Sequence, residues 1–265
     1  MELYRLLDFT LDEPDRFGNN TNSTKSDLNT VRKDVKISTE FNNFLKDKSV
    51  IIVGPSPYLK GLKRGSFIDS HDIVVRLNKG WQVDKDLVED YGEKTTIRYH
   101  CMMEHENNGG KFEIDEMKKK NVKWLASQFP YNLSYFHNDN KKFNSQNQGR
   151  INFHVPADLM YHLNLHHMMQ TRMNVATAAI FDLINYDIDY LDLSGISFYK
   201  DGWIGDYKSG ATNTDSSGKY NMDTKDMQKE GHAQEAQMHL LKLLLATEEK
   251  FDVDDEIQNI LLESK

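Results

Sequence analysis

The sequence predicts an α/β fold, a mainly parallel Rossmann-like sheet flanked by helices. Short apolar runs rich in β-branched residues recur along the chain, and helix-length segments separate several of them. The first run stops abruptly at a glycine-proline turn. Such runs are typical of strands buried on both faces, and their alternation with helices is typical of a parallel sheet.

The predicted strands are short and apolar. The first, SVIIV over residues 49–53, ends at Gly54 and Pro55, which favour a turn. Further runs of the same kind predict strands over residues 73–77, 95–99, 122–126 and 188–193.

Helical spacing of apolar and small residues predicts a helix before the last of these strands and others around it. The predicted helices cover residues 157–170, 174–185, 232–245 and 252–262.

The chain divides into an extension and one domain. Residues 19–34 are polar and lack a hydrophobic period, so residues 1–48 are interpreted as an N-terminal extension and residues 49–265 as a single domain. Residues 199–231 are polar and contain glycines, which predicts a long loop. We interpret the part from about 200 to 231 as a lid over a site, with a disordered segment as the alternative.

Composition excludes several function classes. The 265 residues include 33 Lys and Arg against 41 Asp and Glu, a net charge of −8, which argues against nucleic acid as a partner. The chain has no apolar run long enough to span a membrane, and acids interrupt the first residues where a signal peptide needs an apolar core. A single cysteine, Cys101, excludes an internal disulfide and favours a reducing, cytoplasmic setting.

Two groups of histidines and acids raise the question of a metal. No HExxH motif, DxD motif or matching carboxylate accompanies them, so we interpret them as ordinary surface or packed residues and expect no metal and no cofactor. The residues are His100, Glu104, His105, His162, His166 and His167.

Polar residues near the strand ends are candidates for ligand contacts. Asn78 follows the second strand, where α/β proteins bind ligands, while His71 and Asp72 are expected to brace the preceding turn. The turn GPSPYLKG at residues 54–61 either offers backbone amides to a nucleotide or is an ordinary turn. His232 begins a helix after the lid and is either a general base or a histidine without a task.

Several segments together resemble the sialyltransferases of glycosyltransferase family 29. VGPSPYLKGLKRGSFIDSHDIVVRLNKGW at residues 53–81, followed by DYGEKTT at 90–96, resembles the long sialylmotif. RMNVATAAIFDLINYDIDYLDLSGISFY at 172–199 resembles the short sialylmotif and also the bacterial family 42 enzymes, and GHAQEAQ at 231–237 resembles the very short motif. The resemblance covers about residues 49 to 240 in order.

The resemblance implies a soluble glycosyltransferase of microbial or viral type with a GT-A-like variant of the Rossmann fold. It implies an inverting, metal-independent transfer of sialic acid from CMP-sialic acid to a glycan hydroxyl. By position, His232 would be the general base, and the hydroxyls of two tyrosines would bind the leaving phosphate. The donor would be bound by side chains and by a close backbone approach. The two tyrosines are Tyr199 and Tyr207, and the residues that would bind the donor are Ser56, Asn78, Asn174 and Gly195.

The sequence also departs from the family. Pro55 replaces the usual asparagine, and Val175 and Ala176 replace polar donor-binding residues, for which Asn174 or Thr177 could substitute. Two alternatives therefore stay open: a transferase that uses CMP-Kdo, and a non-catalytic relative that binds a nucleotide or a glycan. A Rossmann dehydrogenase is excluded because the glycine fingerprint is missing.

Overall fold

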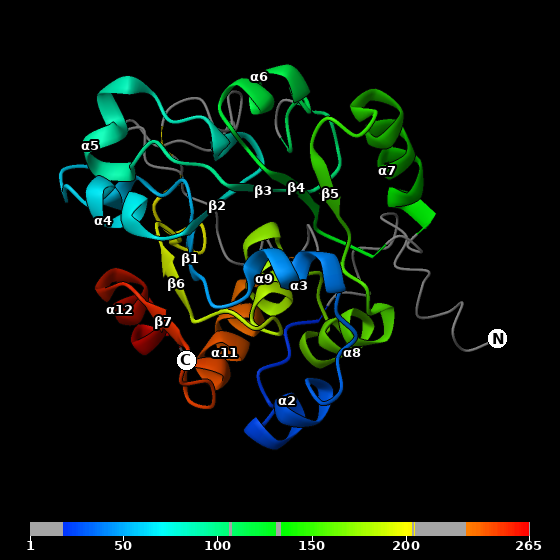
Figure 1. Cartoon of the computed structure of the whole chain (residues 1–265). Coiled ribbons are helices and arrows are strands. Elements are labelled where there is room, and N and C mark those ends of the chain that lie inside the picture. Colours follow the sequence, from blue (N-terminus) through cyan, green and yellow to red (C-terminus); the bar gives the residue numbers. More distant parts are fainter. Residues whose placement is uncertain (1–17, 106–107, 131–133, 203, 205–231, 265) are drawn as a thin grey trace.

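A computed structural model describes residues 18–105, 108–130, 134–202, 204 and 232–264, without the side chains of residues 134–139. Its centre is a seven-stranded sheet with the strand order β5-β4-β3-β2-β1-β6-β7 (Figure 1). Every neighbouring pair of strands is parallel, so all carboxyl ends meet at one edge. The predicted α/β class with a parallel sheet flanked by helices is confirmed.

The central strands match the predicted runs. β1 (Ser49–Val53) and β2 (Ile73–Leu77) have the predicted bounds. β3 (Ile97–His100), β4 (Trp124–Ser127) and β6 (Tyr190–Ser194) each begin two residues later than predicted.

Two edge strands were not predicted. β5 (Asn152–His154) and β7 (Phe251–Val253) have three residues each, and each includes a polar residue. Such segments are too short to show the apolar run or the alternation that predicts a strand.

Helices cover the sheet in two layers (Figure 1), and alternate residues of β1 pack against one layer or the other. Val50 and Ile52 belong to the larger core, which α3, α8, α9, α11 and α12 help to close. Ile51 and Val53 face the other layer. That layer is formed by α4 (Gly65–Ser70), α5 (Val88–Tyr91), α6 (Ile114–Lys119) and α7 (Ser134–Asn147).

Several helices of the larger core begin at polar caps. Asn174 caps α9 (Val175–Leu183) because its Oδ1 accepts a hydrogen bond from the Thr177 amide at 2.9 Å. In the same way, Asp158 caps α8 and Asp254 caps α12. The remaining bounds are α8 (Leu159–Met169), α11 (Gln234–Leu245) and α12 (Asp255–Glu263).

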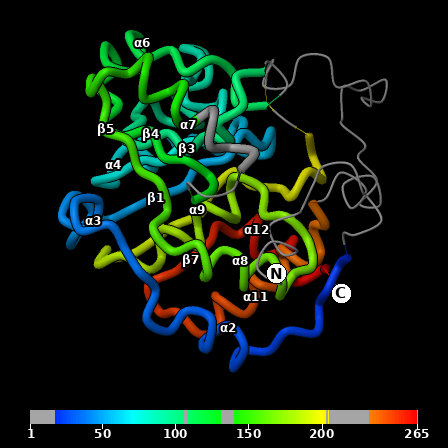
Figure 2. Tube along the Cα trace, turned by 90° about the vertical axis from the view of Figure 1, so that its right-hand side faces the viewer, coloured from blue at the N-terminus to red at the C-terminus, as the bar shows by residue number. Residues whose placement is uncertain are grey.

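The described part of the predicted extension, residues 18–48, is packed onto the domain. It forms α2 (Lys25–Val31) and α3 (Thr39–Leu45), and α2 lies beside α11 (Figures 1 and 2). Leu28, Phe41 and Leu45 are fully buried in the larger core. These residues therefore contribute to the same core as the sheet.

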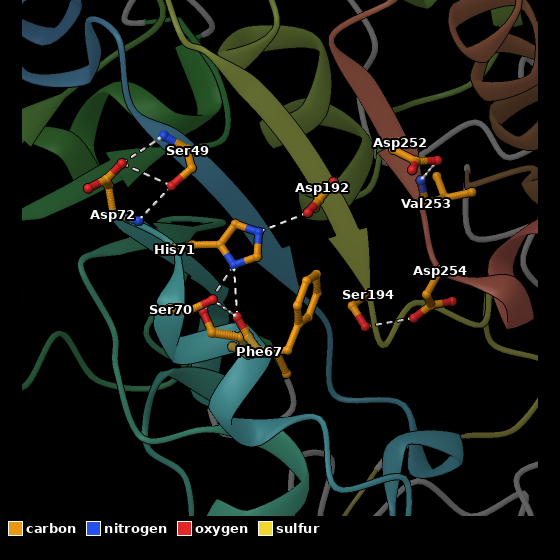
Figure 3. Close-up of polar contacts among 11 residues, drawn as sticks. Ser49, Phe67, Ser70, His71, Asp72, Asp192, Ser194, Asp252, Val253 and Asp254 are labelled. Carbon is orange, nitrogen blue, oxygen red and sulfur yellow. Dashed lines mark hydrogen bonds and ion pairs between the residues drawn. The ribbon is translucent and has the colours of Figure 1, made fainter.

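His71 and Asp72 brace the start of β2, as predicted from the sequence (Figure 3). The His71 Nδ1 lies 3.0 Å from the Phe67 carbonyl oxygen, and its Nε2 lies 2.8 Å from Oδ2 of Asp192 on β6. Asp72 accepts a hydrogen bond from the Ser49 amide at 3.0 Å. These side-chain bonds, to neighbouring backbone and to the Asp192 carboxylate, join β1, β2 and β6 at this point.

A buried arginine holds the segment that follows α5. Arg76 donates to the carbonyl oxygens of Tyr91, Gly92 and Lys94 at 2.6, 3.1 and 3.0 Å. Burial lowers the pKa of its guanidinium to about 10, so it stays charged at neutral pH. Asp69 accepts hydrogen bonds from the amide of Lys94 at 3.0 Å and from the preceding amide at 2.8 Å.

The predicted lid lies outside the described residues, apart from residues 200–202 and 204. Across the described part of the chain, no helix combines the length and apolar character that a bilayer crossing requires.

Replacing Phe41 with alanine tests whether residues 18–48 stabilise the domain. The Phe41 ring stacks on His154 with centroids 3.9 Å apart and meets Trp124 edge-on at 4.9 Å. We expect Phe41→Ala to lower the free energy of unfolding in urea by about 3–5 kcal/mol, the range for buried aromatic truncations. Leu262→Ala, at a side chain that is 77% exposed, should change it by less than about 0.5 kcal/mol. Similar small losses in both variants would contradict this role.

Buried histidines predict that acid destabilises the protein. Burial lowers the pKa of His162 to about 4, below the ordinary value of 6.5. The unfolded chain therefore binds this proton first, and the free energy of unfolding should fall as the pH drops from about 7 to 4. We expect His162→Gln to flatten this dependence in urea titrations. His167→Gln, on the exposed side of the same helix, should keep the wild-type slope, and an unchanged slope in His162→Gln would refute the assignment.

Candidate active site

A cavity of about 190 Å³ opens at the carboxyl edge of the sheet. Loops after β1, β2, β3, β4 and β6 line it, together with the start of α9 and with His232, which lies two residues before α11. Six of the predicted site residues border this one cavity: Ser56, Asn78, Asn174, Gly195, Tyr199 and His232. The seventh, Tyr207, lies outside the described residues.

Ser56 presents a hydroxyl with no partner among the described residues. Its Oγ is buried and makes no hydrogen bond there. Its backbone is fixed, because its amide donates to the Gly195 carbonyl at 3.0 Å and its carbonyl accepts from the Tyr91 hydroxyl at 2.7 Å. A buried hydroxyl of this kind costs free energy unless a ligand or water satisfies it.

Asn78 turns its amide group toward the cavity from a left-handed backbone conformation. Its φ is 50°, and Arg98 holds this conformation by donating from Nε to the Asn78 carbonyl at 2.8 Å. Oδ1 of Asn78 accepts from the Cys101 amide at 2.9 Å. This bond fixes which side-chain atom is the oxygen, and it leaves the NH₂ group to face a ligand.

Gly195 allows two backbones to approach at the floor of the cavity. Its φ is 73°, and a Cβ at this position would lie 2.6 Å from the Gly54 carbonyl oxygen. A Cβ on Gly54 would in turn lie 2.3 Å from the Gly195 carbonyl oxygen. The contact between the residues that follow β1 and β6, together with the positive φ of Gly195, therefore explains both glycines without a bound ligand.

The start of α9 borders the cavity with its first amides. Val175 and Ala176 line the cavity, while the Oδ1 of Asn174 is used as the helix cap. The Asn174 amide donates to Oε1 of Gln237 at 2.9 Å, which joins α9 to α11. The free amides and dipole of a helix start favour an anion.

His232 lies beside the segment that precedes this helix. Its Nδ1 lies 3.1 Å from the Arg172 carbonyl oxygen, so Nδ1 carries the proton and donates it. The lone pair of the neutral ring is then on Nε2. The next residue is also fixed, because the Ala233 amide donates to the Thr171 hydroxyl at 2.9 Å.

Tyr199 lines the cavity from a strained turn. Both Phe198 and Tyr199 have a positive φ, 50° and 66°, which is uncommon for large side chains. The Lys200 amide donates to the Ser197 carbonyl at 3.0 Å and closes this turn.

The sequence reasoning did not single out several polar residues of the cavity wall, of which Gln128 and Arg172 are two. Gln128 directly follows β4, the position that identified Asn78 after β2, so the same rule would have found it. Arg172 lies three residues before the first residue of α9 and is the arginine among the described lining residues. Its position in a loop carries no local signal. No carboxylate occurs among the described residues that line the cavity.

The histidines and acids that raised the question of a metal are spread over the fold. His100 is buried, accepts at Nδ1 from the Met102 amide at 2.9 Å, and donates from Nε2 to the Gly110 carbonyl at 3.1 Å. Glu104 pairs with Lys142 at 2.6 Å. The described residues contain no group of three or more His, Cys, Asp or Glu side chains that would hold a metal ion.

A distant asparagine caps α11, the helix that follows His232. The N-cap position is Ala233, whose side chain cannot accept a hydrogen bond. Asn19 supplies the cap instead. The Oδ1 of Asn19 accepts from the Ala236 amide at 2.9 Å, and the Nδ2 of Asn19 donates to Glu235 at 3.0 Å. The segment before α2 thus supplies the cap that the helix lacks locally.

Comparisons with known proteins identify one family and similar folds. The family model described as glycosyltransferase family 29 (sialyltransferase) matches residues 8–174. A solved mammalian sialyltransferase, in complex with Gal-beta-1-3GalNAc-ortho-nitrophenol, is 16% identical with a TM-score of 0.53, over 96% of this chain and 85% of that chain. The α-2,3-sialyltransferase of Campylobacter jejuni is 15% identical with a TM-score of 0.51, over 85% and 80%. A search of curated protein sequences finds no match.

Asn19→Ala should loosen the first turn of α11. We expect faster amide exchange in peptides covering residues 233–240 and a loss of about 1 kcal/mol in the free energy of unfolding, as for other lost helix caps. Asn22→Ala, at a nearby exposed asparagine, is the control and should change neither quantity. Equal exchange in Asn19→Ala and the wild type would show that the cap does not stabilise this turn.

Proposed function

Because the chain belongs to glycosyltransferase family 29, the sialyltransferases, we propose that it transfers sialic acid from CMP-sialic acid to a hydroxyl group of a glycan. We propose inversion at the anomeric carbon and no requirement for a metal ion. The observation that carries this proposal is the cavity at the carboxyl edge. Its described lining combines Arg172, His232, the start of α9, the Ser56 hydroxyl and the Asn78 NH₂ group, and it has no carboxylate.

Ser56 and Asn78 fit the nucleoside part of the donor. The Ser56 hydroxyl makes no hydrogen bond with a described residue, and the Asn78 NH₂ group is oriented by the bond from Cys101 to its oxygen. Both groups follow strands, where doubly wound sheets bind nucleotides. The ribose hydroxyls and the cytosine carbonyl of CMP offer matching partners.

The start of α9 and Arg172 fit the anionic part of the donor. CMP-sialic acid carries a phosphate and a carboxylate, and both are stabilised by free amides and by a guanidinium. The lining without a carboxylate avoids repulsion with these anions, although the whole chain has a net charge of −8.

Departure of CMP needs hydrogen-bond donors at the phosphate. The bond between the anomeric carbon and the phosphate oxygen breaks, and its electron pair stays on the phosphate. The Tyr199 hydroxyl, with the amides of α9, would stabilise that charge. Tyr207 is the second tyrosine proposed for this task.

His232 is the proposed general base. The acceptor hydroxyl forms the new bond to the anomeric carbon, and its proton goes to Nε2, which holds the ring's lone pair because Nδ1 donates to Arg172. Attack from the side opposite to the leaving phosphate gives inversion.

The cationic and N–H groups of the lining support the proposal that no metal ion is required. Mg²⁺ prefers carboxylate and other oxygen ligands, while the described lining offers cationic and N–H groups where the phosphate charge develops. These groups would take the part that a metal ion plays in other transferases.

His232→Ala tests the proposed chemistry. We expect kcat for CMP release from the donor to fall by about 10²–10⁴ with EDTA present, the range for loss of a general base, while the Kd of CMP stays near that of the wild type. His167→Ala is the control, because this histidine is exposed and lies outside the cavity lining. Unchanged turnover in His232→Ala would reject the general base.

The donor and the acceptor are tested in the same assay. CMP-sialic acid and CMP-Kdo are offered side by side, each with simple galactosides and with the β1-3-linked disaccharide bound by the mammalian structure. Faster turnover of CMP-Kdo would replace sialic acid by Kdo in the proposal. Turnover of neither donor would reject the proposed transfer.

A further inference from the structure

Tyr58, in the loop after β1, holds the turn that follows β6. Its hydroxyl oxygen accepts hydrogen bonds from the amides of Gly195 and Ile196 at 2.6 and 3.2 Å. The same hydroxyl donates to Oδ2 of Asp254 at 2.7 Å. The phenol therefore uses its donor and both of its acceptor positions on this contact.

Asp254 ties the end of β7 to the same turn. Its Oδ2 also accepts from the Ser194 hydroxyl at 2.6 Å, as Figure 3 shows, and from the Gly195 amide at 3.3 Å. Its Oδ1 accepts from the Ile257 amide at 3.0 Å and its own amide donates to the Leu193 carbonyl at 3.0 Å. The carboxylate is thus fixed from both sides.

This turn forms one wall of the cavity. Residues 195–199 all line it, and Gly195, Phe198 and Tyr199 have positive φ values. Large side chains keep a left-handed backbone only where surrounding contacts hold it. The phenol and the carboxylate supply such contacts at the start of the turn.

We propose that Tyr58 and Asp254 are positioning residues of the donor site, which hold the turn at residues 195–199, and with it Tyr199, in the conformation that binds the CMP part of the donor. The inference rests on the proposed function for the identity of the ligand. Asp254 lies beyond the range of the sialylmotif resemblance, in the segment that joins β7 to α12.

The chemistry of the pair suits a permanent contact. Burial and the neighbouring Asp254 charge raise the pKa of the Tyr58 phenol well above its usual value, so the phenol stays protonated and keeps its hydrogen bond to the carboxylate. Tyr58 is two residues from Ser56, whose amide donates to the Gly195 carbonyl. The loop after β1 therefore holds both the N–H and the C=O of Gly195.

Tyr58→Phe keeps the ring and removes these three hydrogen bonds. We expect faster exchange of the amides in residues 194–199, and a Kd of CMP raised about tenfold, the factor that corresponds to roughly one hydrogen bond. The KM of the donor should rise in parallel, while the KM of the glycan acceptor stays unchanged.

Tyr161→Phe is the matched control. Tyr161 is also buried and donates one hydrogen bond, to the Phe181 carbonyl at 2.8 Å, but it does not line the cavity. It should lower the melting temperature and leave the Kd of CMP at the wild-type value. Equal Kd values in Tyr58→Phe and the wild type would overturn the proposal, and so would an equal rise in Tyr161→Phe.

Variants of Asp254 separate positioning from general stability. Asp254→Asn keeps one side-chain oxygen, which can accept from the phenol while the NH₂ group takes the place of Oδ1, whereas Asp254→Ala removes both oxygens. We expect Asp254→Asn to retain most of the CMP affinity that Asp254→Ala loses, and equal losses would count against the proposal. A wild-type protein that binds no CMP would contradict the proposed function instead, and the exchange of residues 194–199 in Tyr58→Phe would then decide the anchoring.

Discussion

The close approach of β1 and β6 at their carboxyl ends is the constraint on which the site depends. Gly54 and Gly195 face each other so closely that a Cβ on either would meet the other's carbonyl oxygen. This approach lets the Ser56 amide reach Gly195, and it places the loop after β1 against the turn after β6. A larger residue at either position would push these two walls of the cavity apart.

The motif that identifies the family consists mainly of framework residues. Asp69, His71 and Arg76 bond to the backbone of neighbouring segments or to another strand, and they hold β2 and the α5 region in place. Ser56 and Asn78 are the motif residues whose side-chain groups face the cavity with bonding capacity left. Most of the motif residues that resemble those of sialyltransferases therefore support the fold, and only a few are placed to contact a ligand.

The sequence predicted what local pattern determines. β1 and β2 were found with their bounds because strands buried on both faces are continuous apolar runs, and Asn78 was found because it follows a strand. Contacts between distant segments leave no such pattern. Asn19 caps a helix more than two hundred residues away, and Tyr58 meets Asp254 across the sheet. Packing in three dimensions decides these partners.

The two ends of the described chain fix the two reacting sides of the proposed site. Residues before α2 cap the helix behind His232, and the residue after β7 holds the turn that carries Tyr199. The proposed base and the tyrosine proposed to donate a hydrogen bond to the phosphate thus depend on segments outside the recognisable motifs. In an in-line displacement, the base and the group that donates a hydrogen bond to the leaving group must keep a fixed separation, because small misplacements of reacting groups cost large factors in rate. Anchoring each of them to a different terminal segment makes the integrity of the whole domain a condition for the reaction.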